Sequence, residues 1–173
     1  MFSFLKEMLR NDFKCRNPVR MLHYRGGVLL KQYDFFNDIT NVGKNHIFDV
    51  QFFGATQIAN NNWWISLINA SGYTTVAAAD TMASHGGWIE WTNYTEATRV
   101  LWGAGASAGQ SITNAAPATF NISAMGSLKG VFVVGNGSAK SGTSGTLWAT
   151  ALFGADVPVA VSDQIKITYT VSA

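Results

Sequence analysis

The sequence predicts an all-β protein: an antiparallel β-sandwich, with jelly-roll or immunoglobulin-like order left open, one short helix and an N-terminal arm. Short β-type runs separated by turn residues about every 8–12 positions follow one another from residue 63 onward. The run at 164–171 alternates apolar and polar residues, as a half-buried strand does. The 77 residues after Glu96 hold only six charged side chains: Arg99, Lys129, Lys140, Asp156, Asp163 and Lys166. So low a charge favours a body whose surface is contacted by neighbouring chains.

The overall composition is that of one folded domain. The chain has 173 residues, 47% of them hydrophobic and 13% charged, whereas roughly 25% charged is usual for soluble domains. No apolar run approaches the roughly 20 residues that cross a bilayer, and the first ten residues lack a signal-peptide pattern, so we expect neither membrane attachment nor Sec export. The single Cys15 predicts no disulfide framework. We expect no cofactor and no metal.

The N-terminal arm, residues 1–36, is basic. Residues 1–31 hold seven basic and two acidic side chains, a net charge of +5, while the remainder carries −3. Its apolar side chains would have nothing to bury against on a nucleic-acid backbone, so we expect no direct binding to nucleic acid. Two alternatives remain: the arm binds a groove on a neighbouring protein, or residues 1–13 pack on their own chain.

Taken in order, the elements begin with a helix. Positions 2, 5, 8, 9 and 13 are apolar at helical spacing, and Asn17-Pro18 should end that helix. Residues 19–36 have strand character, interrupted by two glycines at 26–27. A second helix is predicted over 41–53, with Thr40 or Asn41 as its cap and Gly54 as its stop. The body, 37–173, then continues with eight predicted strands: 63–68, 87–91, 98–102, 111–113, 118–123, 129–134, 146–153 and 164–171.

Signals for catalysis are weak. Residues 105–109 match the G-x-S-x-G pattern around Ser107, but no histidine follows His85 and the next residues predict a strand where a nucleophile elbow needs a helix. The three histidines lack metal-ligand spacing. We interpret Asp80, Glu90 and Glu96 as solvated or interface carboxylates, with Glu90 facing outward. We therefore predict a non-enzymatic protein. A hydrolase that uses Ser107 as its nucleophile ranks below the two structural hypotheses given at the end of this section.

Six tryptophans lie in the body, which suggests either a filled core or a platform for sugars. Adjacent Trp63 and Trp64 cannot both point inward from one strand, because successive side chains alternate between faces. One of them should meet a neighbouring surface or the N-terminal arm.

Several stretches resemble small structural proteins of tailed bacteriophages, over residues 20–173. The most distinctive are Tyr94-Thr-Glu-Ala-Thr-Arg99 and Lys140-Ser-Gly-Thr-Ser-Gly-Thr-Leu147, and the closing Ile-Thr-Tyr-Thr-Val-Ser-Ala is similar as well. The resemblance implies a virion component and no catalytic residues. Some such proteins are capsid cement or decoration proteins, which bind between major capsid subunits and commonly form trimers.

The first hypothesis is therefore a capsid cement or decoration protein that binds the major capsid protein. We expect it to be made in the host cytoplasm and to lie on the outer capsid surface. We expect it to form a homo-oligomer, with a trimer favoured. The alternative is a tail or fibre module that binds host-surface glycan through Trp and Tyr. The residues expected to contact a partner come from the arm, one tryptophan and a glycine-rich loop at 135–145: Phe2, Phe4, Leu5, Arg10, Arg16, Arg20, Arg25, Trp63 and Lys140.

Overall fold

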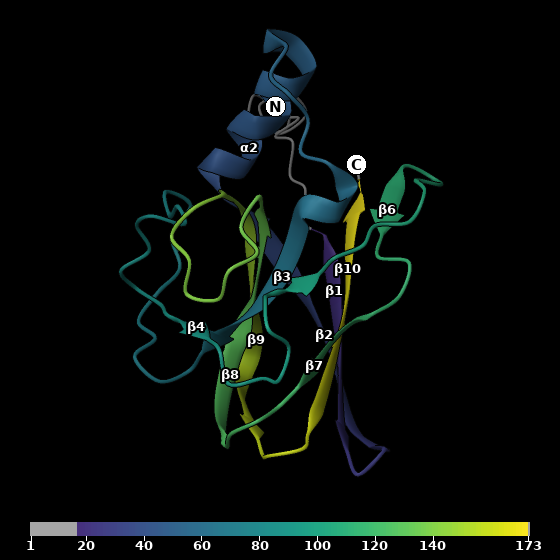
Figure 1. Cartoon of the computed structure of the whole chain (residues 1–173), viewed down its shortest axis with the longest axis vertical. Coiled ribbons are helices and arrows are strands. Elements are labelled where there is room, and N and C mark those ends of the chain that lie inside the picture. Colours follow the sequence, from purple (N-terminus) through teal and green to yellow (C-terminus); the bar gives the residue numbers. More distant parts are fainter. Residues whose placement is uncertain (1–16, 173) are drawn as a thin grey trace, which may run out of the picture.

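The strands form one antiparallel sheet that curls into a half-barrel (Figure 1). The computed structural model describes residues 17–172. The order along the sheet is β4-β3-β8-β9-β2-β1-β10-β6, with β5 also paired to β3 and β7 also paired to β10. The strands are β1 (Pro18–Arg25), β2 (Val28–Ile39), β3 (Trp63–Asn69), β4 (Glu90–Trp91), β5 (Val100–Leu101), β6 (Ser111–Thr113), β7 (Ala118–Asn121), β8 (Gly126–Gly135), β9 (Thr146–Val159) and β10 (Gln164–Ser172).

The β class, the antiparallel pairing and the helix over 41–53 are confirmed, whereas two separate sheets are not shown. The inner face of the curled sheet packs on itself. The outer face around β3 and β8 is covered by irregular chain, because Met82 and Trp88 from the 70–89 segment pack on Ile68 and Phe132. Loops thus do on this side what a second sheet does in a sandwich.

The assignment of residues 18–36 to an arm outside the body is corrected. β1 and β2 pair with each other, β1 pairs with β10, and β2 pairs with β9, so both strands lie inside the sheet. Val19 and Met21 are buried among core residues from the far end of the chain. The basic residues of this stretch do not mark a separate arm, because Arg20 pairs with Asp34 on the sheet surface and Arg25 donates to the buried carboxylate of Asp163. The helix predicted over 2–13 lies outside the described residues.

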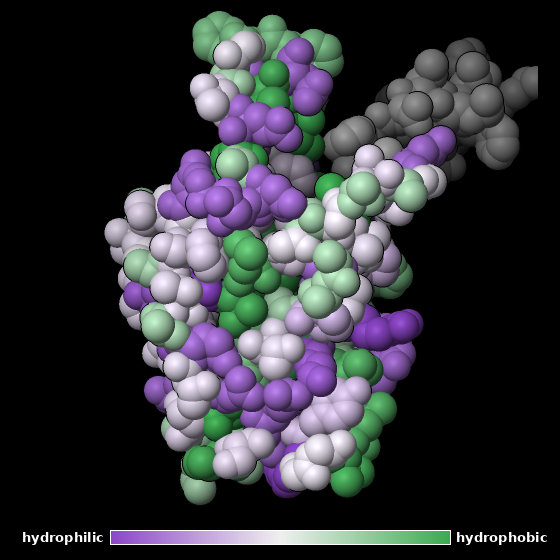
Figure 2. Space-filling view, turned by 45° about the vertical axis from the view of Figure 1, so that its right-hand side comes forward, coloured by the Kyte–Doolittle hydropathy of each residue, from purple (hydrophilic) through white to green (hydrophobic). Residues whose placement is uncertain are grey.

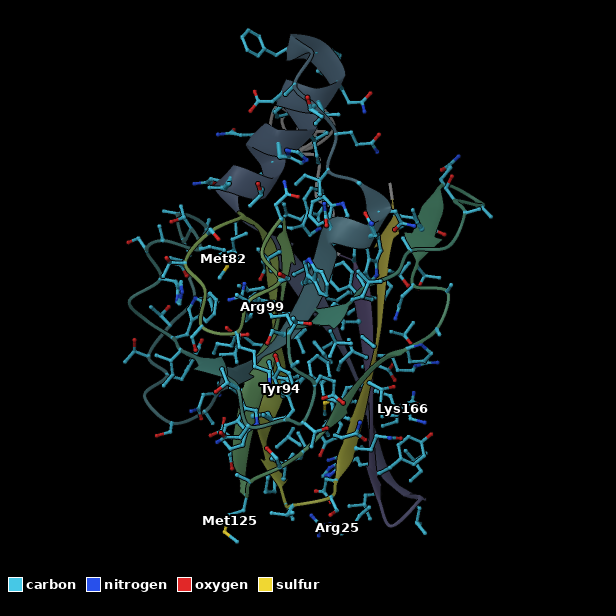
Figure 3. The ribbon with its side chains drawn as sticks, in the orientation of Figure 1. Arg25, Met82, Tyr94, Arg99, Met125 and Lys166 are labelled. Atoms are coloured by element: carbon cyan, nitrogen blue, oxygen red, sulfur yellow. The ribbon has the colours of Figure 1, made fainter. Side chains whose placement is uncertain are left out.

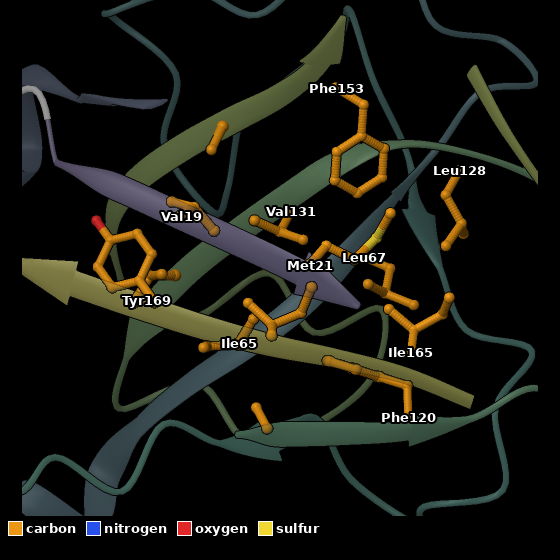
Figure 4. Packing of buried hydrophobic residues seen from close by; sticks show 14 of the residues in the cluster. Val19, Met21, Ile65, Leu67, Phe120, Leu128, Val131, Phe153, Ile165 and Tyr169 are labelled. Carbon is orange, nitrogen blue, oxygen red and sulfur yellow. The ribbon is translucent and has the colours of Figure 1, made fainter. Parts of the chain in front are cut away.

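The core fills the hollow of the half-barrel (Figure 4). Met21, Ile65 and Leu67 are fully buried there, together with Ile165 and Ile167 of β10. On β10 the polar residues alternate with these positions, as the sequence predicted. This strand is therefore half-buried, with one face on the core.

The predicted helix begins at its predicted cap. α2 (Asn41–Phe48) starts where the Thr40 hydroxyl accepts a hydrogen bond from the Gly43 amide at 3.0 Å. It continues as a π-helical turn, η1 (Asp49–Phe53), and ends at Gly54, whose φ of 78° is left-handed. A short 3-10 helix, η2 (Asn60–Asn62), then leads into β3.

At its base the helix is fixed closely to the sheet. Gly43 is buried, and a Cβ there would overlap the carbonyl oxygen of Trp148. The rest of α2 and η1 stands clear of the body as a projection (Figure 2). No helix among residues 17–172 is long and apolar enough to span a bilayer.

Candidate functional site

A pocket of about 380 Å³ opens at the end of the half-barrel that carries the helix. Aromatic and β-branched side chains form most of its wall. The lining residues are Gln57, Ile58, Asn60, Trp63, Trp102, Ala104, Gly105, Ile112, Val133, Trp148, Tyr169 and Val171. We call it the aromatic pocket.

The aromatic pocket is held by residues from four parts of the fold. Trp63, at the start of β3, lies edge-on to Trp148 of β9, with ring centroids 5.8 Å apart. Gly135 of β8 lies behind Trp63, and a Cβ there would come within 3.0 Å of the indole ring. His46 of α2 lies edge-on to the same indole, at 5.9 Å. The helix base and the pocket wall are therefore packed together.

Most polar atoms of the pocket wall form hydrogen bonds within the protein. The Trp102 indole N–H donates to the Tyr169 carbonyl at 2.9 Å, and the Trp148 indole N–H donates to the Tyr169 hydroxyl at 3.1 Å. The Asn60 side chain donates to the Ala104 carbonyl and accepts from the Ala104 amide. The pocket thus presents mainly ring faces and aliphatic carbons, which suits an apolar or aromatic group.

Beside the pocket, the projecting helix exposes three phenylalanines. Phe48 is 54% exposed, Phe52 84% and Phe53 87%. The rings of Phe48 and Phe52 lie 6.4 Å apart. We call these three residues the phenylalanine tip. Figure 2 shows hydrophobic colour at the outer end of the projection.

A buried ion pair, which the sequence analysis missed, holds the outer loops. Arg99 and Glu90 are only 1% and 5% exposed in their side chains, and Arg99 donates to both Glu90 carboxylate oxygens at 3.0 and 2.8 Å. Arg99 also donates to the carbonyls of Gly137 and Gly142, so it anchors the glycine-rich loop. Glu90 does lie on the face of β4 opposite Trp91, as the alternation predicted, but the prediction that it is solvated is wrong, because that loop covers it.

Tyr94 and Ser66 extend this polar cluster. The Ser66 hydroxyl donates to Glu90 and lies 3.1 Å from the Tyr94 hydroxyl. Burial raises the pKa of Tyr94 well above its ordinary value. Figure 3 shows Arg99 and Tyr94 inside the fold, away from the helix end. The cluster is a structural network whose groups satisfy one another.

The structure places the predicted partner-binding residues in different settings. Lys140 donates to the carbonyls of Thr92 and Tyr94, and its ammonium lies 3.8 Å from the centroid of the Tyr94 ring, so its charge is directed inward. Burial lowers the pKa of Lys140. Arg20 pairs with Asp34 on the sheet surface.

The other predicted residues divide between the two ends of the molecule. Arg25 pairs with buried Asp163 at the end opposite the helix. Trp63 is half-buried in the aromatic pocket, while Trp64 packs on the other face of β3, as their alternation predicted. The remaining predictions fall outside the described residues: Phe2, Phe4, Leu5, Arg10 and Arg16.

The residues considered for catalysis or metal binding do not form a site in the described part of the chain. Ser107 lies on an exposed irregular loop that leads into β6. Among residues 17–172, no three His, Cys, Asp or Glu side chains lie close enough to hold a metal ion.

No family model matches this chain, and no curated protein matches it either.

Proposed function

We propose that this protein is a non-enzymatic structural component of a tailed-bacteriophage particle: a capsid cement or decoration protein that attaches to the major capsid protein through its projecting helix. It acts as a homo-oligomer, with a trimer expected, on the outer capsid surface. The resemblance in stretches such as 94–99 supports the class of protein, and the geometry of the helix end supports the mode of attachment.

The phenylalanine tip carries the proposal. Burying a phenylalanine side chain contributes about 1.5–3 kcal/mol, so leaving two of them more than four-fifths exposed forgoes stability that a monomer could have used. Soluble monomers rarely expose contiguous apolar groups of this kind, and such patches mark interaction surfaces. Projection away from the body also lets the tip enter a groove on a partner.

The helix is a suitable anchor because its base is rigid. Thr40 caps it, and close packing of Gly43 on Trp148 leaves little room for the base to shift. A partner that binds the tip therefore does not have to order the helix first, which lowers the cost of binding. Many equivalent copies on a capsid would add their contacts and reinforce the shell.

The test uses particles of the phage that encodes this chain, stripped of the protein and mixed with purified variants. We expect Phe52→Ser with Phe53→Ser to lower binding at least about tenfold, the loss of about 1.4 kcal/mol or more. Met125→Ser is the matched control, since Met125 is 78% exposed at the opposite end (Figure 3), and it should bind normally.

The double variant should also fold normally, because both side chains are largely exposed; its urea midpoint should match the parent within about 0.5 kcal/mol. Undiminished binding of a folded double variant would contradict attachment through the tip. A particle map that places the protein on the tail would contradict the capsid assignment.

The second candidate is a tail or fibre module that binds host glycan, and the aromatic pocket favours it. Trp63 and Trp148 offer ring faces of the kind that stack on sugars. Quenching of tryptophan fluorescence by host-surface glycan, abolished by Trp63→Ala, would support this candidate. The cement proposal expects no quenching.

A further inference from the structure

The phenylalanine tip lies at the C-terminal end of the projecting helix, where backbone carbonyls are left unpaired. The amides of Gly54 and Ala55 both donate to the Asp49 carbonyl. The carbonyls of residues 51–53 accept no hydrogen bond from any residue that the structure describes. Carbonyl oxygens that need a donor therefore accompany the exposed rings, as is usual in the last turn of a helix.

Asp49 adds a full negative charge to the same turn. The residue is exposed, and its carboxylate forms no ion pair or hydrogen bond with any described residue. It is the only Asp, Glu, Lys or Arg between positions 45 and 79 of the sequence. The helix dipole places a further partial charge of about −0.5 at this end. The phenylalanine tip is thus an apolar cluster bordered by negative charge.

A groove that buries the rings must also satisfy these acceptors. A carbonyl or carboxylate that loses water without gaining a donor costs free energy. Arginine and lysine side chains supply donors together with the opposite charge, and their bonds to a carboxylate are the strong, charge-assisted kind. The complement of the tip is therefore an apolar groove with basic side chains at its rim.

The aromatic pocket of a second copy does not offer this complement. No Lys or Arg lines it, and the indole N–H groups of Trp102 and Trp148 already donate within the protein. The Asn60 side chain is likewise bonded to Ala104. Phenylalanine rings would find ring faces there, but the carboxylate of Asp49 would meet no cation. Charge complementarity thus favours a different protein as the partner of the tip.

We propose that the groove of the major capsid protein that receives the phenylalanine tip is apolar at its floor and carries arginine or lysine at its rim, opposite Asp49 and the last carbonyls of the helix. The inference rests on the proposed function, because it specifies the partner at the same site. Burial of the rings supplies most of the affinity, while the charges fix the orientation of the helix and discriminate against other apolar grooves.

Binding of Asp49 variants to the stripped phage particles tests the inference. In about 0.1 M salt we expect Asp49→Asn to lower the binding constant about threefold and Asp49→Lys about tenfold. In about 1 M salt, where the Debye length is about 3 Å, the difference between the parent and Asp49→Lys should largely disappear. A cation near a helix C-terminus stabilises the helix, so the helix content in circular dichroism should not fall.

Asp156→Asn and Asp156→Lys are the matched controls. Each changes the net charge by the same amount as the corresponding variant at position 49, but Asp156 lies on β9 in an exposed pair with Lys129. Both should bind like the parent. Equal weakening by Asp156→Lys and Asp49→Lys would show that overall charge controls binding, and it would overturn the basic rim.

The phenylalanine variant separates this inference from the proposed function. If Phe52→Ser with Phe53→Ser loses binding while Asp49→Lys binds as well as the parent, the tip attaches but the basic rim is wrong. If the phenylalanine variant binds normally, attachment through the tip fails, and the inference fails with it.

Sedimentation of the purified protein checks the identity of the partner. We expect the variant with Phe52→Ser and Phe53→Ser to keep the oligomeric state of the parent, because the tip is reserved for a different protein. A smaller oligomer in the variant would show that the tip binds a second copy, and it would overturn the inference.

Discussion

The two ends of the half-barrel are closed in different ways. At the end away from the helix, Asp163 is fully buried and accepts hydrogen bonds from Arg25 at 2.7 and 2.8 Å and from the Ala160 amide at 2.8 Å, with the His23 ring 2.7 Å away. At the helix end, tryptophan rings surround an open pocket, and the phenylalanine tip projects beyond it.

This difference separates what stabilises the fold from what is available for binding. Both ends expose apolar side chains, since Leu29, Leu30 and Met125 lie at the far end. The helix end combines a pocket with a projecting aromatic cluster. The end built around Asp163 is completed by its own chain, whereas the helix end is suited to receive further segments.

Removing the carboxylate at the closed end should have the largest effect. We expect Asp163→Ala to lower the free energy of unfolding by about 3 kcal/mol, because His23 and the Ala160 amide lose a buried partner. The value lies at the low end for a buried pair, since the Arg25 side chain is 52% exposed. Urea unfolding measures it. Asp156→Ala, in the exposed pair with Lys129, should change stability by less than about 0.5 kcal/mol.

A smaller loss is expected where the helix meets the body. Gly43→Ala places a methyl group against the Trp148 carbonyl, and we expect a loss of about 1–2 kcal/mol, since overpacking strains the backbone. The control is Gly154→Ala, where a Cβ meets nothing within 4 Å. If the loss at position 43 were no larger than at 154, the helix base would not be rigidly seated.

Acid should reduce the difference in the free energy of unfolding between the parent protein and Asp163→Ala. This is the smallest of the three effects on stability predicted here. Hydrogen bonding from Arg25 holds the pKa of Asp163 well below its usual range. The unfolded chain therefore takes up a proton near pH 4 while the folded chain does not, and stability falls as pH drops. The gap between the two proteins should shrink by about 1 kcal/mol by pH 3. A gap independent of pH would show that the charge on Asp163 contributes little.

Much of the local structure could be predicted from residue patterns. The cap at Thr40 and the stop at Gly54 follow from side-chain and backbone chemistry within a few residues. The alternation of Trp63 with Trp64 follows from the pleat of one strand. These features need no knowledge of which segments pair.

The site depended on pairings between distant segments. The aromatic pocket joins Trp63, Trp102, Trp148 and Tyr169, which belong to separate parts of the chain and meet only when the sheet curls. Likewise, Arg99 and Glu90 meet beneath a loop whose glycine-rich sequence indicates only a turn. Pattern and spacing carry no information about such contacts.

Residues 19–36 show most clearly what the sequence alone could not predict. Local alternation was enough to identify residues 19–36 as strand-like, because the pleat imposes a period of two on any half-buried strand. Whether that strand lay outside the body or within its sheet was decided by hydrogen bonds to β10 and β9, more than a hundred residues away. The chain's own residues specified helix, strands and turns; the long-range pairing that curls one sheet on itself placed the pocket and the helix together at one end.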